Sequence, residues 1–242
     1  MENLRSARGA YAVSEVTKLK LIASAEQAVD RHGVGGVSAR EIVRAAGLSN
    51  TAAVAYHFGS TDELLRQVLI VRMEELNGLR DRLIANSIIP LSQCDMTTLV
   101  EYICLPHVIF ARRNGGGTAY QGFVCAYLPH IYPNGALWVF GAESPSSPNM
   151  SRIVQEIRLR LAGISDELFN RRMFNMIMLF CNVMRTFPPS SFSRDNADNI
   201  FELLGDAISQ CVALLSAEVG VPDRVSAMSQ QLVPEGAAVS AE

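Results

Sequence analysis

Two short helices separated by a glycine, within residues 38 to 58, constrain the fold of this chain more than any other feature. Ser38 and Glu41 have the spacing of a capping box, which predicts that a helix begins there. Gly47 interrupts this helix where the chain must reverse, and a residue with a side chain would be strained there at positive φ. Ser49 is expected to cap a second helix, which continues to the end of the segment. A helix, a glycine turn and another helix in this order predict a helix-turn-helix.

Small and apolar residues in the segment provide a contact between the two helices. Ile42 and Ala46 lie one turn apart on one face of the first helix, and Leu48 and Val54 are placed to meet them. An ordinary αα-hairpin would have the same spacing. The spacing alone therefore leaves a DNA-binding role and a purely structural role both open.

Helical periodicity continues through the rest of the chain, and no alternating apolar pattern of any length indicates a strand. We therefore predict an all-α fold, with a proline at position 106 that kinks one helix and a loop over residues 131–149. The tail after residue 220 is expected to be frayed. The further helices are expected at 15–32, 60–85, 96–113, 118–130, 149–162, 165–186 and 195–218.

Composition bounds the class of protein. Of the 242 residues, 49% are hydrophobic, which is enough for a sizeable core. The net charge is −3, but residues 1–60 carry seven Arg or Lys against five acids, a sign that is consistent with a nucleic-acid partner. The five scattered cysteines are expected to be buried free thiols. With no signal-peptide pattern and no run of about 18 apolar residues, we expect a cytoplasmic protein without a membrane span.

Several linked motifs between Lys18 and Arg72 resemble the N-terminal domain of TetR-family repressors. In order, they are His-Gly, Val-Ser-x-x-x-Ile, Ala-Gly-Leu-Ser, Tyr-His-Phe-Gly-Ser and Asp-Glu-Leu-Leu. The resemblance implies a DNA-binding domain at residues 1–60, a ligand-binding and dimerisation domain at 61–220, and a flexible tail at 221–242. It implies a double-stranded DNA operator as the partner and transcriptional regulation, as a repressor, as the function.

The resemblance also implies which residues contact DNA. The second helix of the motif would lie in the major groove, with Ser49, Asn50 and Thr51 facing base edges or phosphates. Tyr56 and His57 match a Tyr-His pair that would bind phosphate oxygens. A histidine favoured by the helix dipole is the alternative for His57.

Two arginines of the first helix complete the set of expected DNA contacts. Arg40 could bind a guanine or a phosphate, with a solvated surface arginine as the alternative, and Arg44 lies one turn later. The chain departs from the family pattern at Ala55 and Thr61, and its only lysines are Lys18 and Lys20. Since a lysine is missing where Thr61 stands, one phosphate contact is absent and arginines must supply the positive charge.

The larger domain is expected to hold an apolar small-molecule effector, such as an aromatic, steroid-like or fatty acyl compound. Aromatic residues gather between positions 99 and 180, although aromatics at helical spacing also form ordinary cores. His107 and Gln121 are the expected polar anchors. The predicted ligand-binding residues are Tyr102, His107, Phe110, Gln121, Phe123, Tyr127, Trp138 and Phe174.

A homodimer is expected through the helices at 165–186 and 195–218. Each of these helices is apolar over more than one face, which a two-fold four-helix bundle would bury. Burial within a single chain is the alternative. The stripes are Leu168, Met173, Met176, Ile177, Phe180 and Met184 in one helix, and Ile200, Leu203, Leu204, Ala207, Ile208, Cys211 and Leu215 in the other.

Enzyme signatures are missing from the sequence: there is no Gly-x-Ser-x-Gly, no His-Glu-x-x-His and no P-loop. We therefore expect no catalytic activity, no cofactor and no metal, with a sensor built from His107, His130 and a cysteine as the metal-binding alternative. The remaining functional alternative is a helical small-molecule or protein-binding module that has lost DNA binding.

Overall fold

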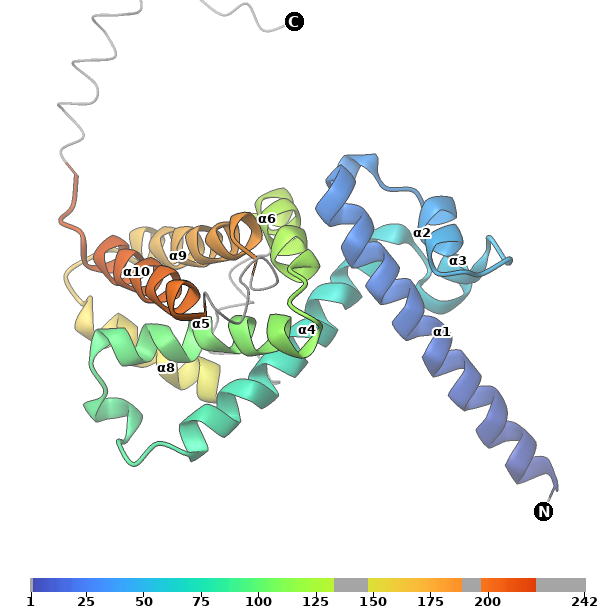
Figure 1. Cartoon of the computed structure of the whole chain (residues 1–242), viewed down its shortest axis with the longest axis horizontal. Helices are drawn as coiled ribbons and strands as arrows, with labels where there is room; N and C mark the ends of the chain where they lie inside the picture. Colours follow the sequence, from blue (N-terminus) through green and yellow to red (C-terminus); the bar gives the residue numbers. More distant parts are fainter. Residues whose placement is uncertain (1, 133–147, 189–196, 221–242) are drawn as a thin grey trace, which may run out of the picture.

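A computed structural model describes residues 2–132, 148–188 and 197–220, with side chains from residue 14 onward except at 197–199. Within these ranges the chain consists of α-helices, two short 3-10 turns and connecting loops, without strands, so the predicted all-α fold is confirmed (Figure 1). The predicted tail and Trp138 lie outside the described residues. The α-helices are α1 (Glu2–His32), α2 (Ala39–Ala45), α3 (Ala53–Phe58), α4 (Thr61–Ala85), α5 (Met96–Arg113), α6 (Ala119–Ile131), α8 (Pro148–Arg160), α9 (Asp166–Thr186) and α10 (Ala197–Ser216).

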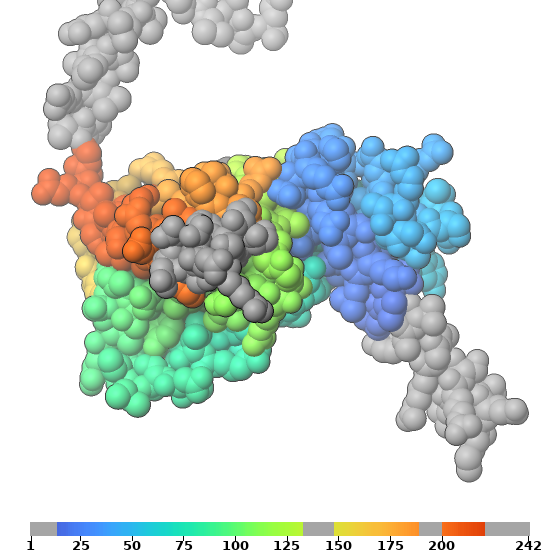
Figure 2. All heavy atoms as spheres, in the orientation of Figure 1, coloured from blue at the N-terminus to red at the C-terminus, as the bar shows by residue number. Residues whose placement is uncertain are grey.

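Helices α1, α2 and α3 pack with the start of α4 into one lobe, which occupies one end of the molecule (Figures 1 and 2). Leu21 and Val29 of α1 and Ile42 of α2 are fully buried in its core, and Val54 of α3 is 2% exposed. Ala46, Leu48 and Phe58 are half-buried and pack against the same core. The small apolar contact that the sequence predicts between the two helices is therefore present.

Side-chain caps define where α2 and α4 begin. Ser38 Oγ accepts from the Glu41 amide at 3.3 Å and the Ser38 amide donates to Glu41 Oε2 at 3.1 Å, which completes the predicted capping box of α2. Ser60 Oγ accepts from the Glu63 amide at 3.0 Å at the start of α4. The Glu63 carboxylate, however, accepts from Arg66 and Gln67 and not from the Ser60 amide, so α4 has a side-chain cap but not a reciprocal capping box.

The turn between α2 and α3 differs from the prediction in one respect. Gly47 has φ +69°, as expected, and the Leu48 amide closes the end of α2 by donating to the Val43 carbonyl at 3.1 Å. Ser49 does not cap α3, which begins only at Ala53 and has no side-chain cap. Asn50 Oδ1 accepts from the Ala52 amide at 3.0 Å, a local turn that holds the chain out of the helix for three further residues.

The larger body is built from most of α4 together with α5, α6, α8, α9 and α10 (Figure 1). Helix α4 starts in the first lobe and continues into this body, where it packs against α5 and α8. Helix α9 packs against α10 and α6, with Phe123 and Phe180 fully buried in the core. The chain therefore passes from one part to the other through a continuous helix of 25 residues.

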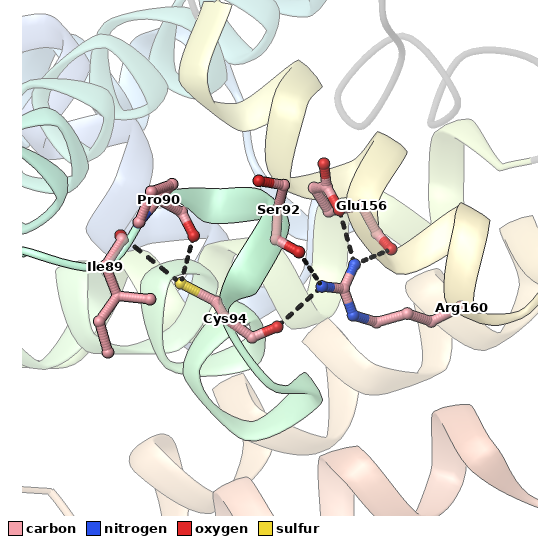
Figure 3. A network of polar contacts seen from close by, with 6 residues as sticks. All are labelled: Ile89, Pro90, Ser92, Cys94, Glu156 and Arg160. Atoms are coloured by element: carbon pink, nitrogen blue, oxygen red, sulfur yellow. Dashed lines mark hydrogen bonds and ion pairs between the residues drawn. The ribbon is translucent and has the colours of Figure 1, made fainter.

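A polar network ties the connection between α4 and α5 to α8 (Figure 3). Arg160 Nη2 donates to the carbonyl oxygens of Ser92 at 3.1 Å and Cys94 at 2.8 Å. Its Nη1 forms an ion pair with Glu156 at 2.7 Å. This network fixes the 3-10 turn at Leu91–Gln93 and, with it, the start of α5.

The apolar stripes of α9 and α10 are buried within the chain, which corrects the basis of the predicted dimer. Eleven of the thirteen predicted stripe residues are buried, and only Leu168 and Leu203 are half-exposed. Packing of α9 against α10, α6 and α5 covers them. The alternative of burial within a single chain therefore holds for these residues, and a dimer must use other ones.

The five cysteines are free, and all are buried except Cys125, which is half-buried. This agrees with the predicted free thiols, and burial raises the pKa of Cys181 above its ordinary value. Among the helices in the described ranges, none combines the length and apolar content that a bilayer span requires.

Candidate nucleic-acid interface and effector cavity

Two arginines of α2 form the positively charged part of the helix-turn-helix surface. Arg40 and Arg44 are exposed and form no ion pair or hydrogen bond with any residue that the structure describes. Both line one surface hollow together with Thr51 from the turn before α3. Glu41 lines the same hollow, but its carboxylate accepts from Ser38, and these hydrogen bonds hold its pKa below the ordinary value. The hollow therefore presents two unpaired guanidinium groups.

The three predicted residues before α3 lie in a turn and not on the helix itself. Ser49, Asn50 and Thr51 are all exposed. Since Asn50 Oδ1 is occupied by the Ala52 amide, the side chain of Asn50 presents its Nδ2 group as a donor to an external partner. Such a donor suits a phosphate oxygen or an acceptor on a base edge.

Tyr56 and His57 occupy different environments although they are adjacent. Tyr56 is 82% exposed, and its ring meets that of His57 edge-on at 4.8 Å between centroids. His57 is half-buried in a separate hollow, beside Lys18 of α1 and Glu63 of α4. The structure therefore places Tyr56 freely at the surface, whereas His57 lies where α1 and α4 approach each other.

A partly open cavity of about 40 Å³ lies in the larger body. It exceeds the roughly 10–15 Å³ that one water needs, and it is much smaller than the pocket of a drug-sized ligand, which is roughly 300 Å³ or more. Helix α4 provides a whole face of the wall. The lining residues are Leu69, Met73, Leu76, Asn77, Arg80, Ile103, His107, Tyr120, Val124, Leu128, Met150 and Ile177.

Arg80 is the charged group in this lining, and a proline explains its position. Pro106 has no amide hydrogen, so the carbonyl of Tyr102, four residues earlier in α5, lacks its helical donor. Arg80 Nε donates to this carbonyl at 2.9 Å, and its Nη1 donates to Asn77 Oδ1. Arg80 is only 4% exposed, and burial lowers the pKa of its guanidinium to about 10, which leaves it protonated at pH 7.

His107 provides a neutral polar group in the same wall. Burial, with a smaller contribution from the charge of Arg80, lowers the pKa of His107 to about 3. Its ring stacks on Tyr120 at 5.9 Å, and its Nδ1 lies 4.0 Å from Cys181 Sγ. In the part of the chain that the structure describes, no group of three or more His, Cys, Asp or Glu side chains could hold a metal ion.

The predicted ligand-binding residues are placed mostly behind the wall of the cavity. His107 lines it, whereas Tyr102, Phe110, Phe123 and Tyr127 are buried in the surrounding core.

The two remaining described candidates also lie away from the wall. Gln121 is fully buried; its Nε2 donates to the His107 carbonyl at 3.4 Å and its Oε1 has no partner. Phe174 is half-buried and stacks on Tyr132 at 4.6 Å.

Sequence analysis missed Asn77 and Arg80. A signal was present: Leu69, Met73, Leu76 and Arg80 follow one another at helical spacing, so a charged residue lies on the apolar stripe of α4.

Two sets of contacts connect the cavity to α1. In the first, Tyr120 meets Phe110 edge-on at 5.8 Å, and the Arg72 guanidinium lies over the Phe110 ring at 5.3 Å. Arg72 Nε then pairs with Glu26 of α1 at 2.6 Å. A residue on the cavity wall is thus joined through three side chains to the DNA-binding lobe.

The second set is a close approach between α6 and α1. A Cβ atom at Gly122 of α6 would overlap the side chain of Asp30, so glycine at this position leaves room for that side chain between the two helices. Asp30 also accepts from Arg185 Nε of α9 at 3.0 Å. The end of α1 is therefore fixed against both α6 and α9.

Comparison with known proteins gives two findings. Residues 21–68 match the family model of bacterial regulatory proteins of the tetR family, a span from the second half of α1 through the first turns of α4. A solved structure described as a TetR-family transcriptional regulator from Mesorhizobium loti MAFF303099 aligns over 83% of this chain and 97% of that chain. The alignment has 15% identity and a TM-score of 0.43. No curated protein sequence matches the chain.

Proposed function

Because this chain belongs to the TetR family of bacterial regulatory proteins, we propose that it is a repressor whose affinity for its operator falls when a small molecule occupies the larger body. It acts by binding and not by catalysis. The observation that carries the proposal is α4, which begins at Thr61 inside the helix-turn-helix lobe and lines the cavity from Leu69 to Arg80. The division at residues 1–60, 61–220 and 221–242 stays a prediction.

The unpaired arginines support DNA binding by this chain. Arg40 and Arg44 lie on one exposed surface with Thr51, and a guanidinium suits both phosphate and guanine. Tyr56, at 82% exposure, is available to a phosphate oxygen. Ser49, Asn50, Thr51 and His57 stay candidates for the same interface.

Effector control requires that a change at the cavity alter the lobe. An occupant that moves Leu69, Met73 or Leu76 moves α4, and α4 continues directly into the lobe. The close approach of Gly122 to the Asp30 side chain couples a shift of α6 to that side chain of α1. These two routes support a ligand-dependent change in the orientation of the lobes, since packed interfaces switch between discrete arrangements.

A homodimer through the outer faces of α9 and α10 completes the proposal. After the chain has folded, Phe201 is 56% exposed and Leu179, Val183 and Val212 are half-buried. Phe201 and Val212 are three turns apart on α10, with Gly205 between them, a pattern that allows close helix packing across a two-fold axis. Two helix-turn-helix lobes related in this way would meet successive major grooves.

We expect Arg40→Ala and Arg44→Ala to weaken DNA binding in different ways. Arg44→Ala is expected to lower the affinity for all sequences and to reduce the slope of log Kd against log salt by about 1, because one phosphate contact is lost. Arg40→Ala is expected to reduce discrimination between sequences by about 1–3 kcal/mol. Fluorescence anisotropy with the DNA upstream of the chain's own coding region, and with a scrambled fragment, measures both effects.

Arg82→Ala is the matched control, since this exposed arginine near the end of α4 donates its Nε to the Gly78 carbonyl. It is expected to leave binding unchanged. No binding of the wild-type chain to either fragment at low salt would contradict the proposed repressor. It would favour a helical binding module that has lost DNA recognition.

We expect Val212→Glu to convert a dimer into a monomer, because a carboxylate on each side of a two-fold interface would be buried against its like. Size-exclusion chromatography with light scattering gives the mass directly, and circular dichroism checks that the variant folds. Leu159→Glu, a change at a 63% exposed residue of α8, is expected to remain dimeric. A monomeric wild type, or a dimeric Val212→Glu protein, would rule out this interface.

A further inference from the structure

A buried arginine without a carboxylate partner lies in the wall of the cavity. Arg80 is 4% exposed and sits on the apolar stripe of α4 between Leu76 and the end of the helix. In the part of the chain that the structure describes, Arg80 forms no ion pair. The neighbouring acid, Asp81, is exposed and accepts from Asn149 Nδ2 at 2.9 Å; its charge raises the pKa of Arg80, but burial has the larger effect and lowers it. Among the described residues, the guanidinium of Arg80 therefore has no carboxylate in direct contact.

The hydrogen bonds of Arg80 orient its guanidinium but use only part of it. Nε donates to the Tyr102 carbonyl that Pro106 leaves without a helical donor, and Nη1 donates to Asn77 Oδ1. A guanidinium carries five N–H donors. A neutral amide side chain would satisfy the Tyr102 carbonyl equally well, so these bonds do not account for a full positive charge at this position.

Holding this charge unpaired in the interior has an energetic cost. Removing a cation from water costs several kcal/mol unless an anion offsets it. Burial also opposes protonation of Arg80, as its lowered pKa of about 10 indicates. Among the described residues no carboxylate pairs with Arg80, so an external anion is the natural partner.

The rest of the cavity defines what kind of anion fits. Beside Arg80, the polar groups are Asn77, the neutral His107 and Tyr120. The other lining residues are aliphatic or methionine, including Met73 and Met150, whose flexible side chains can adapt to an occupant. A volume of about 40 Å³ favours a small occupant. An inorganic ion would leave the apolar wall without contacts, whereas a carboxylic acid would use both kinds of surface.

We propose that the effector is a small monocarboxylic acid, with its carboxylate paired to Arg80 and its apolar body against the aliphatic wall of α4. The claim that this acid is an effector rests on the proposed function, whereas the claim that the acid binds at Arg80 does not depend on DNA binding. The pair replaces the missing counter-charge, and the planar guanidinium suits a carboxylate in two-point contact. The effector expected from the sequence was a mostly apolar molecule, and the charge of Arg80 adds the requirement that it be an anion.

The test compares acids with neutral molecules of the same shape. Isothermal calorimetry on the full chain without DNA uses butyrate and benzoate as probes, with butyramide and benzamide as the uncharged counterparts and inorganic phosphate as a plain anion. We expect at least one of the two acids to bind. The corresponding amide and inorganic phosphate are each expected to bind at least about 30-fold more weakly, which is the effect of removing one partner from a buried charge pair.

Two variants of α4 distinguish the loss of the Arg80 charge from a general loss of stability. Arg80→Gln retains a donor for the Tyr102 carbonyl and removes the charge, and it is expected to weaken acid binding at least about 30-fold while the melting temperature stays close to that of the wild type. Arg82→Gln, at an exposed position, is expected to bind like the wild type. If Arg80→Gln does not fold, Arg80→Lys keeps the charge without the fork and is expected to bind the acid more weakly than wild type.

Failure of this inference differs from failure of the proposed function. If an acid binds but leaves operator affinity unchanged, the carboxylate site stands and ligand control fails. If neither acid binds at millimolar concentration, or the amides or phosphate bind as well as the acids, the anionic site is wrong whatever the DNA result. Unchanged acid binding by Arg80→Gln overturns it in the same way.

Discussion

Replacing Glu26 by methionine is expected to reduce the free energy of unfolding by about 3 kcal/mol. Glu26 and Arg72 pair at 2.6 Å, and their side chains are only 9% and 15% exposed. Without Glu26, the Arg72 guanidinium stays in a desolvated position between α1 and α4. The second partner of Arg72 is Glu75 at 2.8 Å, which is 44% exposed and so offsets the orphaned charge only in part. We therefore expect a loss of unfolding free energy at the lower end of the usual range for removing one partner of a buried ion pair. Urea unfolding followed by circular dichroism measures the loss.

A double replacement tests whether the loss arises from the orphaned charge. Glu26→Met with Arg72→Met removes both ions and leaves two flexible apolar side chains, so it is expected to recover most of the stability. Glu15→Met breaks the exposed Glu15–Lys18 pair and is expected to change stability by less than about 1 kcal/mol. A double variant that is as unstable as the sum of the two single variants would show that the pair is not energetically coupled.

Sequence reasoning succeeded where the determining interactions are local. The box of Ser38 and Glu41 closes over three residues, and the positive φ of Gly47 follows from the end of the same helix. It failed at Ser49 because a competing local bond, from the Ala52 amide to Asn50, was equally available to the chain. Short hydrogen-bonding residues in a row therefore do not indicate where the helix starts, and here it starts after both Ser49 and Asn50.

The cavity could not be predicted in the same way, because its polar chemistry depends on a contact between helices. Arg80 bonds to the Tyr102 carbonyl, 22 residues away, only because Pro106 frees that carbonyl. A kink at Pro106 was expected from the sequence, but nothing in the sequence alone joined this proline to Arg80. Likewise, the burial of the α9 stripe depends on packing against α6 and α10, which periodicity cannot distinguish from burial in a dimer.

Lowering the pH from 7 to 5 is expected to cost the wild-type chain about 2 kcal/mol of stability through His107 alone, and about 3 kcal/mol by pH 4. Burial holds the pKa of folded His107 at about 3, against an ordinary value of 6.5. Between these two values the unfolded chain binds more protons than the folded one, so stability rises with pH across the window and is lost as the pH falls below 6.5. Chemical denaturation at pH 7, 5 and 4 measures the change.

His107→Phe removes the titrating group and retains a ring that can stack on Tyr120. Between pH 7 and pH 5, the variant is therefore expected to lose about 2 kcal/mol less stability than the wild type loses. Comparing each protein with itself at the two pH values cancels any constant packing cost of the substitution. His130→Gln, at an exposed histidine of α6, is the matched control and should follow the wild type. If wild type and His107→Phe lose equal stability, His107 is not held neutral by burial. The cavity wall would then carry a second cation beside Arg80, which would strengthen the demand for an anionic occupant at acid pH.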